Sequence, residues 1–172
     1  MSESPFQILG IAPRFELDAA AIQRTLLRES ARRHPDRAPD PVTAASWTDE
    51  LARLNAAADL VRDDLERAEQ LVLLRGGPGP SDDRRLPDGF LESMLGVRME
   101  LEEAVASGDE VGRRSLEDWG RREWAERRAL VEQLLDGPEG EDAATLAEVR
   151  LQLNCWRYSQ RMLEQLDRSG GR

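Results

Sequence analysis

The sequence has no lysine, one cysteine (Cys155) and one histidine (His34) among its 172 residues. A single thiol and a single imidazole cannot form a disulfide, a Cys/His zinc site or a histidine-based catalytic triad within one chain. No apolar run is long enough to cross a bilayer, and the amino-terminal residues do not form a basic flank followed by an apolar stretch. We therefore expect a cytoplasmic protein that holds no metal or cofactor and does not enter a membrane, because a lone cysteine is typical of a reducing compartment.

The charge of the chain is strongly one-sided. It has 34 acidic residues against 24 basic ones, all arginine, for a net charge of -10. Such an acidic chain repels phosphate backbones, so nucleic acid is not expected as a partner. Hydrophobic residues make up 40%, charged residues 34% and aromatic residues only 5% of the sequence. This profile is typical of amphipathic helices around a core and predicts an all-α fold.

A cluster of helix-breaking residues divides the chain. Residues 76–85 read GGPGPSDDRR and combine glycine and proline with mixed charge. We predict a first domain over 1–75, a linker over 76–85 and a second domain over 86–172. Most of the net negative charge belongs to the second domain.

The first domain shows the pattern of a helical hairpin. A short helix is expected over Pro5–Gly10, and Asp18 is a suitable N-cap for a helix that must end by His34, because Pro35 disfavours helical geometry in the residue before it. After a proline-containing loop, apolar residues recur every three or four positions, and the helix is expected to continue through 67–74. They are Trp47, Leu51, Leu54, Ala58, Val61 and Leu65. Packed against Ile22 and Leu26, this stripe gives an antiparallel hairpin with a His-Pro-Asp loop at one end.

Three further helices are expected in the second domain, over roughly 88–106, 110–136 and 142–167. Two of them carry apolar stripes that can face each other: Leu116, Trp119, Leu130 and Leu134 on one, and Leu146, Val149, Leu153, Trp156 and Leu163 on the other. Short connections between three such helices predict an antiparallel bundle.

A row of arginines leads to the His-Pro-Asp loop. Arg24, Arg28 and Arg32 recur every four residues and therefore lie along one edge of their helix, away from its apolar arc. In an acidic chain this local positive charge favours an acidic protein surface as partner. Taken singly, such a row is usually a solvated face, and a histidine beside proline is usually a turn residue. Their position in one loop region favours a binding site, in which the proline restricts the backbone and lowers the entropy lost on binding.

Several motifs of the first half together resemble a J-domain, the module that stimulates ATP hydrolysis by DnaK-class chaperones. They are SPFQILG at 4–10, the arginine-edged helix, HPDR at 34–37 and LNAAA at 54–58. The resemblance implies that His34, Pro35 and Asp36 contact the chaperone at the junction of its ATPase domain and linker. It also implies that Arg24, Arg28, Arg32 and Arg37 contribute to the same binding site. Asp36 is expected to matter most, because its carboxylate can pair with a cation of the chaperone and shift the chaperone's conformational equilibrium.

The first helix of the second domain has two apolar arcs. Phe90, Met94, Val97, Leu101 and Val105 share one arc, whereas Leu91, Leu95 and Met99 lie about a third of a turn away. One helix of a small bundle needs only one buried stripe. The second arc, flanked by Glu92, Glu102 and Glu103, is therefore a candidate protein-binding surface. Alternatively, the first domain or the third helix covers it.

The segment FLESMLGVRMELEE at 90–103, and the order of J-domain, linker and acidic three-helix bundle, resemble the HscB family of co-chaperones in iron–sulfur cluster assembly. The resemblance implies an HscA-class ATPase as chaperone partner. It also implies that Leu91, Leu95, Met99 and Glu103 bind an IscU-like scaffold protein. The aromatic residue that the family places on its last helix is replaced here by Leu151 or Leu153.

The leading hypothesis is an adaptor that catalyses no reaction itself, activates a partner ATPase and delivers the scaffold protein to it. A second hypothesis keeps the J-domain but gives the acidic bundle a client unrelated to iron–sulfur clusters. A third is an enzyme that uses Glu102-Glu103 or Asp63-Asp64, but adjacent helical side chains point about 100° apart and do not converge on one substrate. Cys155 is expected to pack in the core, because one thiol cannot replace the four that usually hold a cluster.

Overall fold

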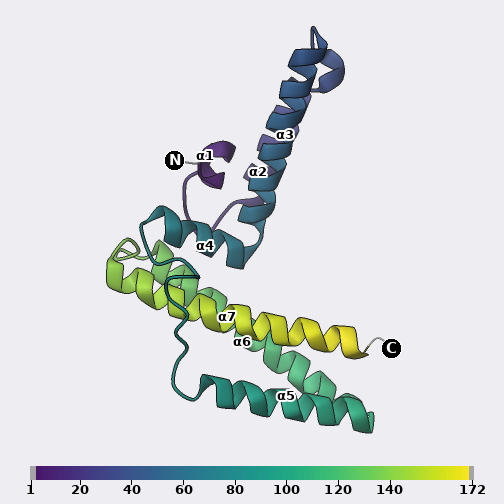
Figure 1. Ribbon diagram of the computed structural model, residues 1–172, viewed down its shortest axis with the longest axis vertical. Helices are drawn as coiled ribbons and strands as arrows, with labels where there is room; N and C mark the ends of the chain where they lie inside the picture. Colours follow the sequence, from purple (N-terminus) through teal and green to yellow (C-terminus); the bar gives the residue numbers. More distant parts are fainter. Residues whose placement is uncertain (1–2, 171–172) are drawn as a thin grey trace. The chain divides into compact units, whose positions relative to one another are not determined.

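The computed structural model describes residues 3–170, with the side chains of 162, 163 and 165–170 left aside. Within these residues the chain is entirely helical apart from turns and loops, so the prediction of an all-α fold is confirmed (Figure 1). The helices are α1 (Pro5–Leu9), α2 (Ala19–Arg32), the 3₁₀ turn η1 (Pro35–Arg37), α3 (Pro41–Arg62), α4 (Asp64–Leu74), α5 (Phe90–Ser107), α6 (Glu110–Asp136) and α7 (Ala143–Gly170). They form two compact units, one ending at Leu74 and the other beginning at Arg75.

Local capping residues determine where the first helices begin. The Ser4 side chain accepts a hydrogen bond from the Gln7 amide, and the Gln7 side chain accepts one from the Ser4 amide, which completes a capping box at the start of α1. Gly10 ends α1 in the left-handed region at φ 64°. Asp18 caps α2 by accepting from the Ala20 amide at 2.8 Å. The expected starts and ends of these two helices are therefore confirmed.

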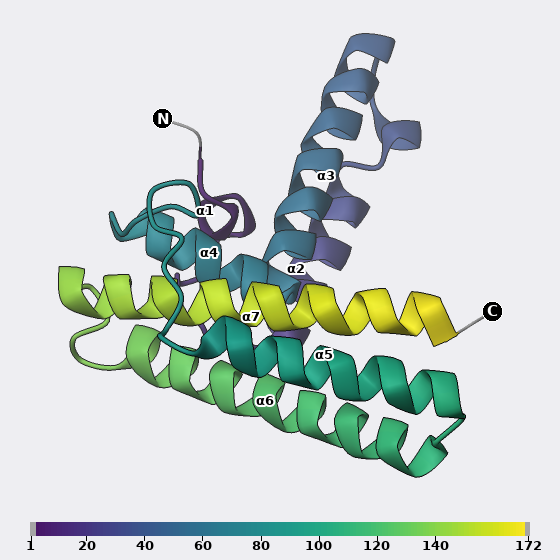
Figure 2. The same ribbon diagram turned by 60° about the horizontal axis from the view of Figure 1, so that its bottom comes forward.

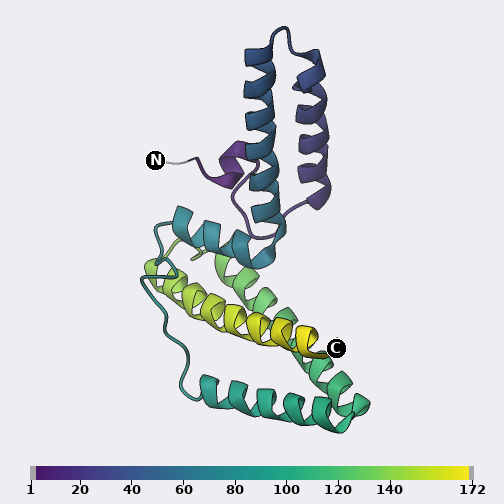
Figure 3. The same cartoon turned by 45° about the vertical axis from the view of Figure 1, so that its right-hand side comes forward.

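The helices α2 and α3 form the expected antiparallel hairpin, with η1 in the connection between them (Figure 3). Ile22 and Leu26 of α2 are buried, as are Leu54, Ala58 and Val61 of α3. Burial of each isoleucine, leucine or valine side chain among them contributes about 1.5–3 kcal/mol to folding. Trp47 and Leu51, at the loop end of the predicted stripe, are only half-buried. The hairpin core is thus concentrated in the half that is remote from the His-Pro-Asp turn.

The predicted continuous helix after residue 41 is wrong at one point, because the chain turns at Asp63. This residue is extended (φ -75°, ψ 122°) and ends α3. Its carboxylate accepts from the Glu66 amide at 2.8 Å and so caps the first turn of α4. The guanidinium of Arg67 donates to the Val61 carbonyl at 2.7 Å, which satisfies an otherwise unpaired group at the end of α3. Leu65 therefore belongs to the next helix.

The second unit is a bundle of α5, α6 and α7 (Figure 2). Phe90 and Met94 of α5 pack with Cys155 of α7, and Trp119 of α6 covers this cluster. The stripe predicted on α6 is displaced by one residue in its second half: Val131 and Leu135 are buried, whereas Leu130 is exposed. Residues 121–128 are mostly charged and interrupt the apolar pattern. The sequence alone therefore does not show which face of the helix is buried after them. On α7 the predicted stripe is buried from Leu146 to Trp156, and the Leu163 side chain lies outside the described residues.

The ten residues expected to act as a linker are attached to the second unit. The buried guanidinium of Arg150 donates from Nε to the Pro78 carbonyl at 3.0 Å. Asn154 donates from Nδ2 to the carbonyls of Asp83, at 3.1 Å, and Arg85, at 3.0 Å. Both donors are on α7, so this segment is a strap along the bundle with defined hydrogen bonds.

Candidate protein-binding sites

The His-Pro-Asp segment is a turn closed by its own hydrogen bonds. His34 Nδ1 accepts from the Asp36 amide at 3.2 Å, and the His34 carbonyl accepts from the Arg37 amide at 2.9 Å. The Asp36 side chain is 86% exposed, and its Oδ2 lies 3.6 Å from His34 Nδ1. The turn therefore fixes the backbone while it leaves the carboxylate free to meet a partner.

The hydrogen bond to His34 also determines which ring nitrogen of the neutral imidazole carries the proton. A neutral imidazole that accepts on Nδ1 carries its proton on Nε2, which makes Nε2 a donor. The His34 side chain is 55% exposed. The turn thus offers a donor and a carboxylate acceptor from residues separated only by Pro35, whose ring limits the backbone freedom that binding would otherwise remove.

The arginine row faces solvent, but its charged groups have local partners. The side chains of Arg24, Arg28 and Arg32 are each about two-thirds exposed. Arg24 Nη2 lies 3.0 Å from Asp18 Oδ2, and this hydrogen bond lowers the pKa of the Asp18 carboxyl. Arg28 Nε lies 3.2 Å and Arg32 Nη1 3.7 Å from the Glu29 carboxylate. The Arg24–Asp18 pair is exposed on both sides and contributes only about 0–1 kcal/mol, and Arg28 and Arg32 share the single Glu29 carboxylate with Arg33, so an acidic surface can compete for these guanidinium groups.

Arg37 does not extend the row. Its Nη1 donates to the Ala31 carbonyl at 3.3 Å, in the last turn of α2. This hydrogen bond satisfies one of the carbonyls left unpaired at a helix end. Arg37 therefore ties the turn back to α2, and its side chain remains exposed beside Asp36 in the sequence.

Glu29 is a residue of this site that sequence reasoning missed. It is 8% exposed, although it lies on the helix that carries the arginine row. Arg33 Nη1 donates to it at 2.7 Å, and Arg33 Nε lies 2.9 Å from Glu50 Oε2 on α3. Glu29, Arg33 and Glu50 therefore form an ionic brace between α2 and α3 next to the turn. The spacing of four residues between Glu29 and Arg33 is the sequence signal that could have indicated it.

The brace predicts a measurable loss of stability when Glu29 is replaced by alanine. Arg33 would keep only Glu50, and its half-buried guanidinium would lose a hydrogen bond of 2.7 Å. Hydrogen bonds to charged groups contribute about 1.5–3 kcal/mol, so we expect the opening free energy of α2 and α3 amides, measured by hydrogen exchange, to fall by about 1–2 kcal/mol. Glu3→Ala is the control, because Glu3 pairs with Arg53 at a similar 2.8 Å but both side chains are more than 60% exposed. Equal losses in the two variants would contradict the brace.

The second apolar arc of α5 is exposed. Leu91, Leu95 and Met99 are 53%, 56% and 61% exposed, respectively. Glu103 is also exposed, and Arg98 pairs with Glu102 at 2.8 Å, so charged groups accompany the arc. An apolar centre with a charged rim is the usual composition of a protein-binding surface. We call Leu91, Leu95, Met99 and Glu103 the α5 face.

Of the two leucines expected to replace the aromatic residue on the last helix, Leu153 is fully buried and Leu151 is half-buried. The full burial of Leu153 removes it from any contact with a partner. Tyr158 is the exposed aromatic residue of α7: it is 41% exposed and packs edge-on against Phe90, with ring centroids 5.7 Å apart. It is the only tyrosine of the chain, which is the signal that could have drawn attention to it.

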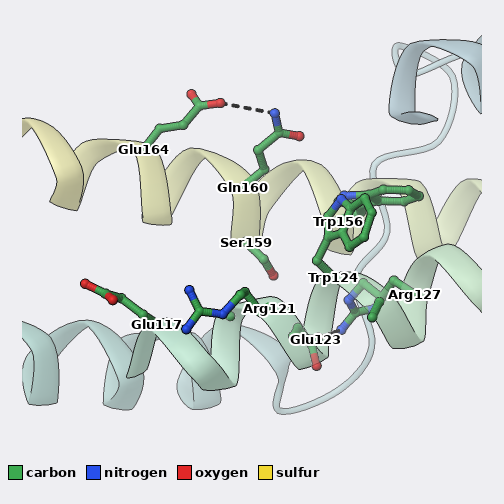
Figure 4. A pocket seen from close by; sticks show the side chains of 11 residues that line it. Glu117, Arg121, Glu123, Trp124, Arg127, Trp156, Ser159, Gln160 and Glu164 are labelled. Carbon is green, nitrogen blue, oxygen red and sulfur yellow. Dashed lines mark hydrogen bonds and ion pairs between the residues drawn. The ribbon is translucent and has the colours of Figure 1, made fainter. Parts of the chain in front are cut away.

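A groove of about 720 Å³ lies between α6 and α7 (Figure 4). Trp124 and Trp156 meet edge-to-face in it, with ring centroids 6.2 Å apart. Several of its polar groups have partners: Arg127 pairs with Glu123, and Gln160 donates to Glu164 at 3.1 Å. The two carboxylate pairs considered for an enzyme were Glu102-Glu103 and Asp63-Asp64. In the structure Glu102 forms an ion pair with Arg98, and Asp63 caps α4.

Among the described residues, no group of three or more His, Cys, Asp or Glu side chains is arranged to hold a metal ion. Likewise, among the helices of residues 3–170, none combines the length and the apolar character needed to span a bilayer.

Cys155 is buried against Phe90 and Met94, and burial raises the pKa of its thiol. The thiolate is the reactive form of cysteine. We therefore expect a thiol reagent at pH 8 to leave the native chain unlabelled over the few minutes in which it labels the chain fully in denaturant. Rapid labelling of the folded chain would show that the bundle opens at this position.

The comparisons with known proteins agree along almost the whole chain. A co-chaperone protein HscB homolog of Ralstonia nicotianae is 31% identical over 97% of this chain and 96% of its own length. A second HscB homolog, from Aeromonas hydrophila, is 28% identical over 95% of this chain and 94% of its own length. No family model matches the chain.

Two solved structures share the fold. Chaperone HscB from Vibrio cholerae superposes with a TM-score of 0.72 at 22% identity and covers 97% of both chains. Human co-chaperone protein HscB superposes with a TM-score of 0.81 at 18% identity, over 98% of this chain and 82% of the human one. With the 31% identity to a full-length relative, the conclusion is that this chain belongs to the HscB family of co-chaperones.

Proposed function

We propose that this chain stimulates the ATPase of a DnaK- or HscA-class chaperone in the cytoplasm and delivers to it an IscU-like scaffold protein of iron–sulfur cluster assembly. The observation that carries the proposal is the turn at the end of α2, in which the Asp36 carboxylate is 86% exposed on a backbone closed by hydrogen bonds. Its place in a chain of the HscB family supports the assignment of partners.

In this proposal the first unit, ending at Leu74, acts on the chaperone. Asp36 pairs with a cation of the chaperone, and His34 donates from Nε2 to a neighbouring acceptor. Arg24, Arg28 and Arg32 exchange their local carboxylates for an acidic surface of the chaperone. These contacts are stronger in the hydrolysis-competent conformation of the chaperone than in its other conformation. The difference between the two binding free energies shifts the chaperone toward the hydrolysis-competent conformation. The chain itself supplies no group to the phosphate chemistry.

The second unit, beginning at Arg75, holds the scaffold protein on the α5 face. Leu91, Leu95 and Met99 supply the apolar centre, and Glu103 supplies a charged contact at its edge. Tyr158 extends the proposed surface on α7. Binding of both partners to one chain raises the effective concentration of scaffold at the chaperone.

The experiment is a steady-state ATPase assay with a purified HscA-class chaperone. We expect the chain to raise the hydrolysis rate when added alone, and to raise it further when an IscU-like scaffold protein is also present. A chaperone that hydrolyses ATP at its basal rate over the whole range of added chain would refute the proposed function.

A further inference from the structure

An exposed leucine lies beside the amino-terminal end of the arginine row. Leu27 of α2 is 62% exposed. Its neighbours on the helix surface include Arg24, three residues before it, and Ala31, four residues after it. The core of the hairpin takes Ile22 and Leu26 instead, so Leu27 belongs to the outward face of the helix.

The local ion pairs explain why Leu27 remains open. The guanidinium of Arg24 is held by Asp18, before the first turn of α2. The guanidinium of Arg28 is held by Glu29, which is almost fully buried. Long arginine side chains commonly cover neighbouring apolar groups, but here carboxylates hold both guanidinium groups and most of the Leu27 side chain stays accessible.

We infer that Leu27 is the apolar anchor with which α2 docks on the ATPase chaperone, at an acidic surface that contains an apolar depression. This inference rests on the proposed function and specifies the partner's surface chemistry. An apolar side chain beside charged and polar ones has the composition of a protein-binding surface, in which the surrounding contacts exclude water. Charge complementarity identifies the occupant, because Arg24 and Arg28 lie about 60° and 100° around the helix from Leu27, and an acidic protein surface can pair with them while it covers Leu27.

The leucine and the arginines should respond differently to salt. Burial of an apolar side chain is only weakly sensitive to ionic strength, whereas exposed ion pairs are screened as salt rises. We expect Leu27→Ala to raise the concentration of chain that gives half-maximal ATPase stimulation about tenfold at both 50 mM and 300 mM salt. Arg24→Gln should show a penalty that shrinks at the higher salt concentration.

The maximal stimulation at saturating chain separates docking from triggering. Leu27→Ala leaves the His34–Asp36 turn intact, so its maximal stimulation should equal that of the unmodified chain. Leu27→Met should restore most of the affinity, because methionine has a similar apolar volume. Alanine and methionine are good helix formers and the site is exposed, so both variants should keep the circular dichroism and melting temperature of the unmodified chain.

Val42→Ala is the matched control. Val42 is a 79% exposed apolar side chain in the first turn of α3, within the same unit. It should leave the half-saturating concentration unchanged. Equal weakening by Val42→Ala and Leu27→Ala would overturn the inference, because it would indicate a general loss of apolar surface.

Three other results would overturn the inference in different ways. Normal affinity of Leu27→Ala, together with weak binding by Arg24→Gln, would remove Leu27 from the docking surface but leave the proposed function in place. Binding of the full chain to phosphatidylserine vesicles that depends on Leu27 would identify a lipid surface as the occupant. Absence of stimulation by the unmodified chain would refute the proposed function, and the inference with it.

Discussion

Replacement of Asp36 by alanine is expected to reduce stimulation of the chaperone ATPase to the basal rate and to leave binding of the scaffold protein unchanged. The carboxylate is 86% exposed, and the turn that presents it is closed by other groups, namely His34 Nδ1 and the backbone. Removal of an exposed side chain changes the free energy of unfolding by about 0.5 kcal/mol or less. A lost charge-assisted contact costs about 1.5–3 kcal/mol at an interface, which corresponds to more than a tenfold loss for one hydrogen bond. Single-turnover ATP hydrolysis by the chaperone measures this loss.

Two further variants show whether the charge of Asp36 is what matters. Asp36→Asn keeps the shape of the side chain and one acceptor but removes the charge, so we expect it to behave like Asp36→Ala. Asp59→Ala removes an acid that is 77% exposed on α3 and should stimulate normally. The role proposed for Asp36 is contradicted if Asp36→Ala stimulates like the unmodified chain, or if Asp59→Ala is impaired to the same degree.

The features that could be predicted from the sequence are those that depend on neighbouring residues. Ser4 and Asp18 begin helices because their side chains reach amides two or three residues ahead. Pro35 stops α2 for an equally local reason. The turn at Asp63 was missed although Asp63 and Glu66 have the spacing of a cap, because the apolar stripe on either side reads as continuous.

The features that could not be predicted depend on which helices face each other. The sequence places three arginines on one face of α2. Only the folded hairpin shows that Arg33 bridges Glu29, on α2, and Glu50, on the neighbouring helix α3. Tyr158 was missed because its exposure depends on how α7 packs on Phe90. Leu153 was given two roles from the sequence, a place in the apolar stripe of α7 and a replacement for the aromatic residue of the family, and its full burial agrees only with the first.

Replacement of both Leu91 and Leu95 by alanine is expected to have the opposite effect to the Asp36 substitution. The two side chains are more than half exposed, so their removal leaves the bundle core of Phe90, Met94 and Cys155 intact. Each leucine that an interface buries contributes about 1.5–3 kcal/mol, and together they should weaken scaffold binding by a hundredfold or more. Stimulation of the chaperone by the variant alone should remain normal. Isothermal titration with the scaffold protein and the ATPase assay measure the two effects separately.

The control for the double variant is Val111→Ala. Val111 is 77% exposed at the start of α6 and lies outside the α5 face, so its loss should affect neither activity. A double variant that loses scaffold binding and ATPase stimulation together, with unchanged circular dichroism, would contradict separate roles for the two units. Normal scaffold binding by the double variant would place the scaffold site elsewhere. In that case the exposed leucines of α5 would have to serve a different client, which a cross-linking reagent placed at Met99→Cys in the chain would identify by the adduct it forms.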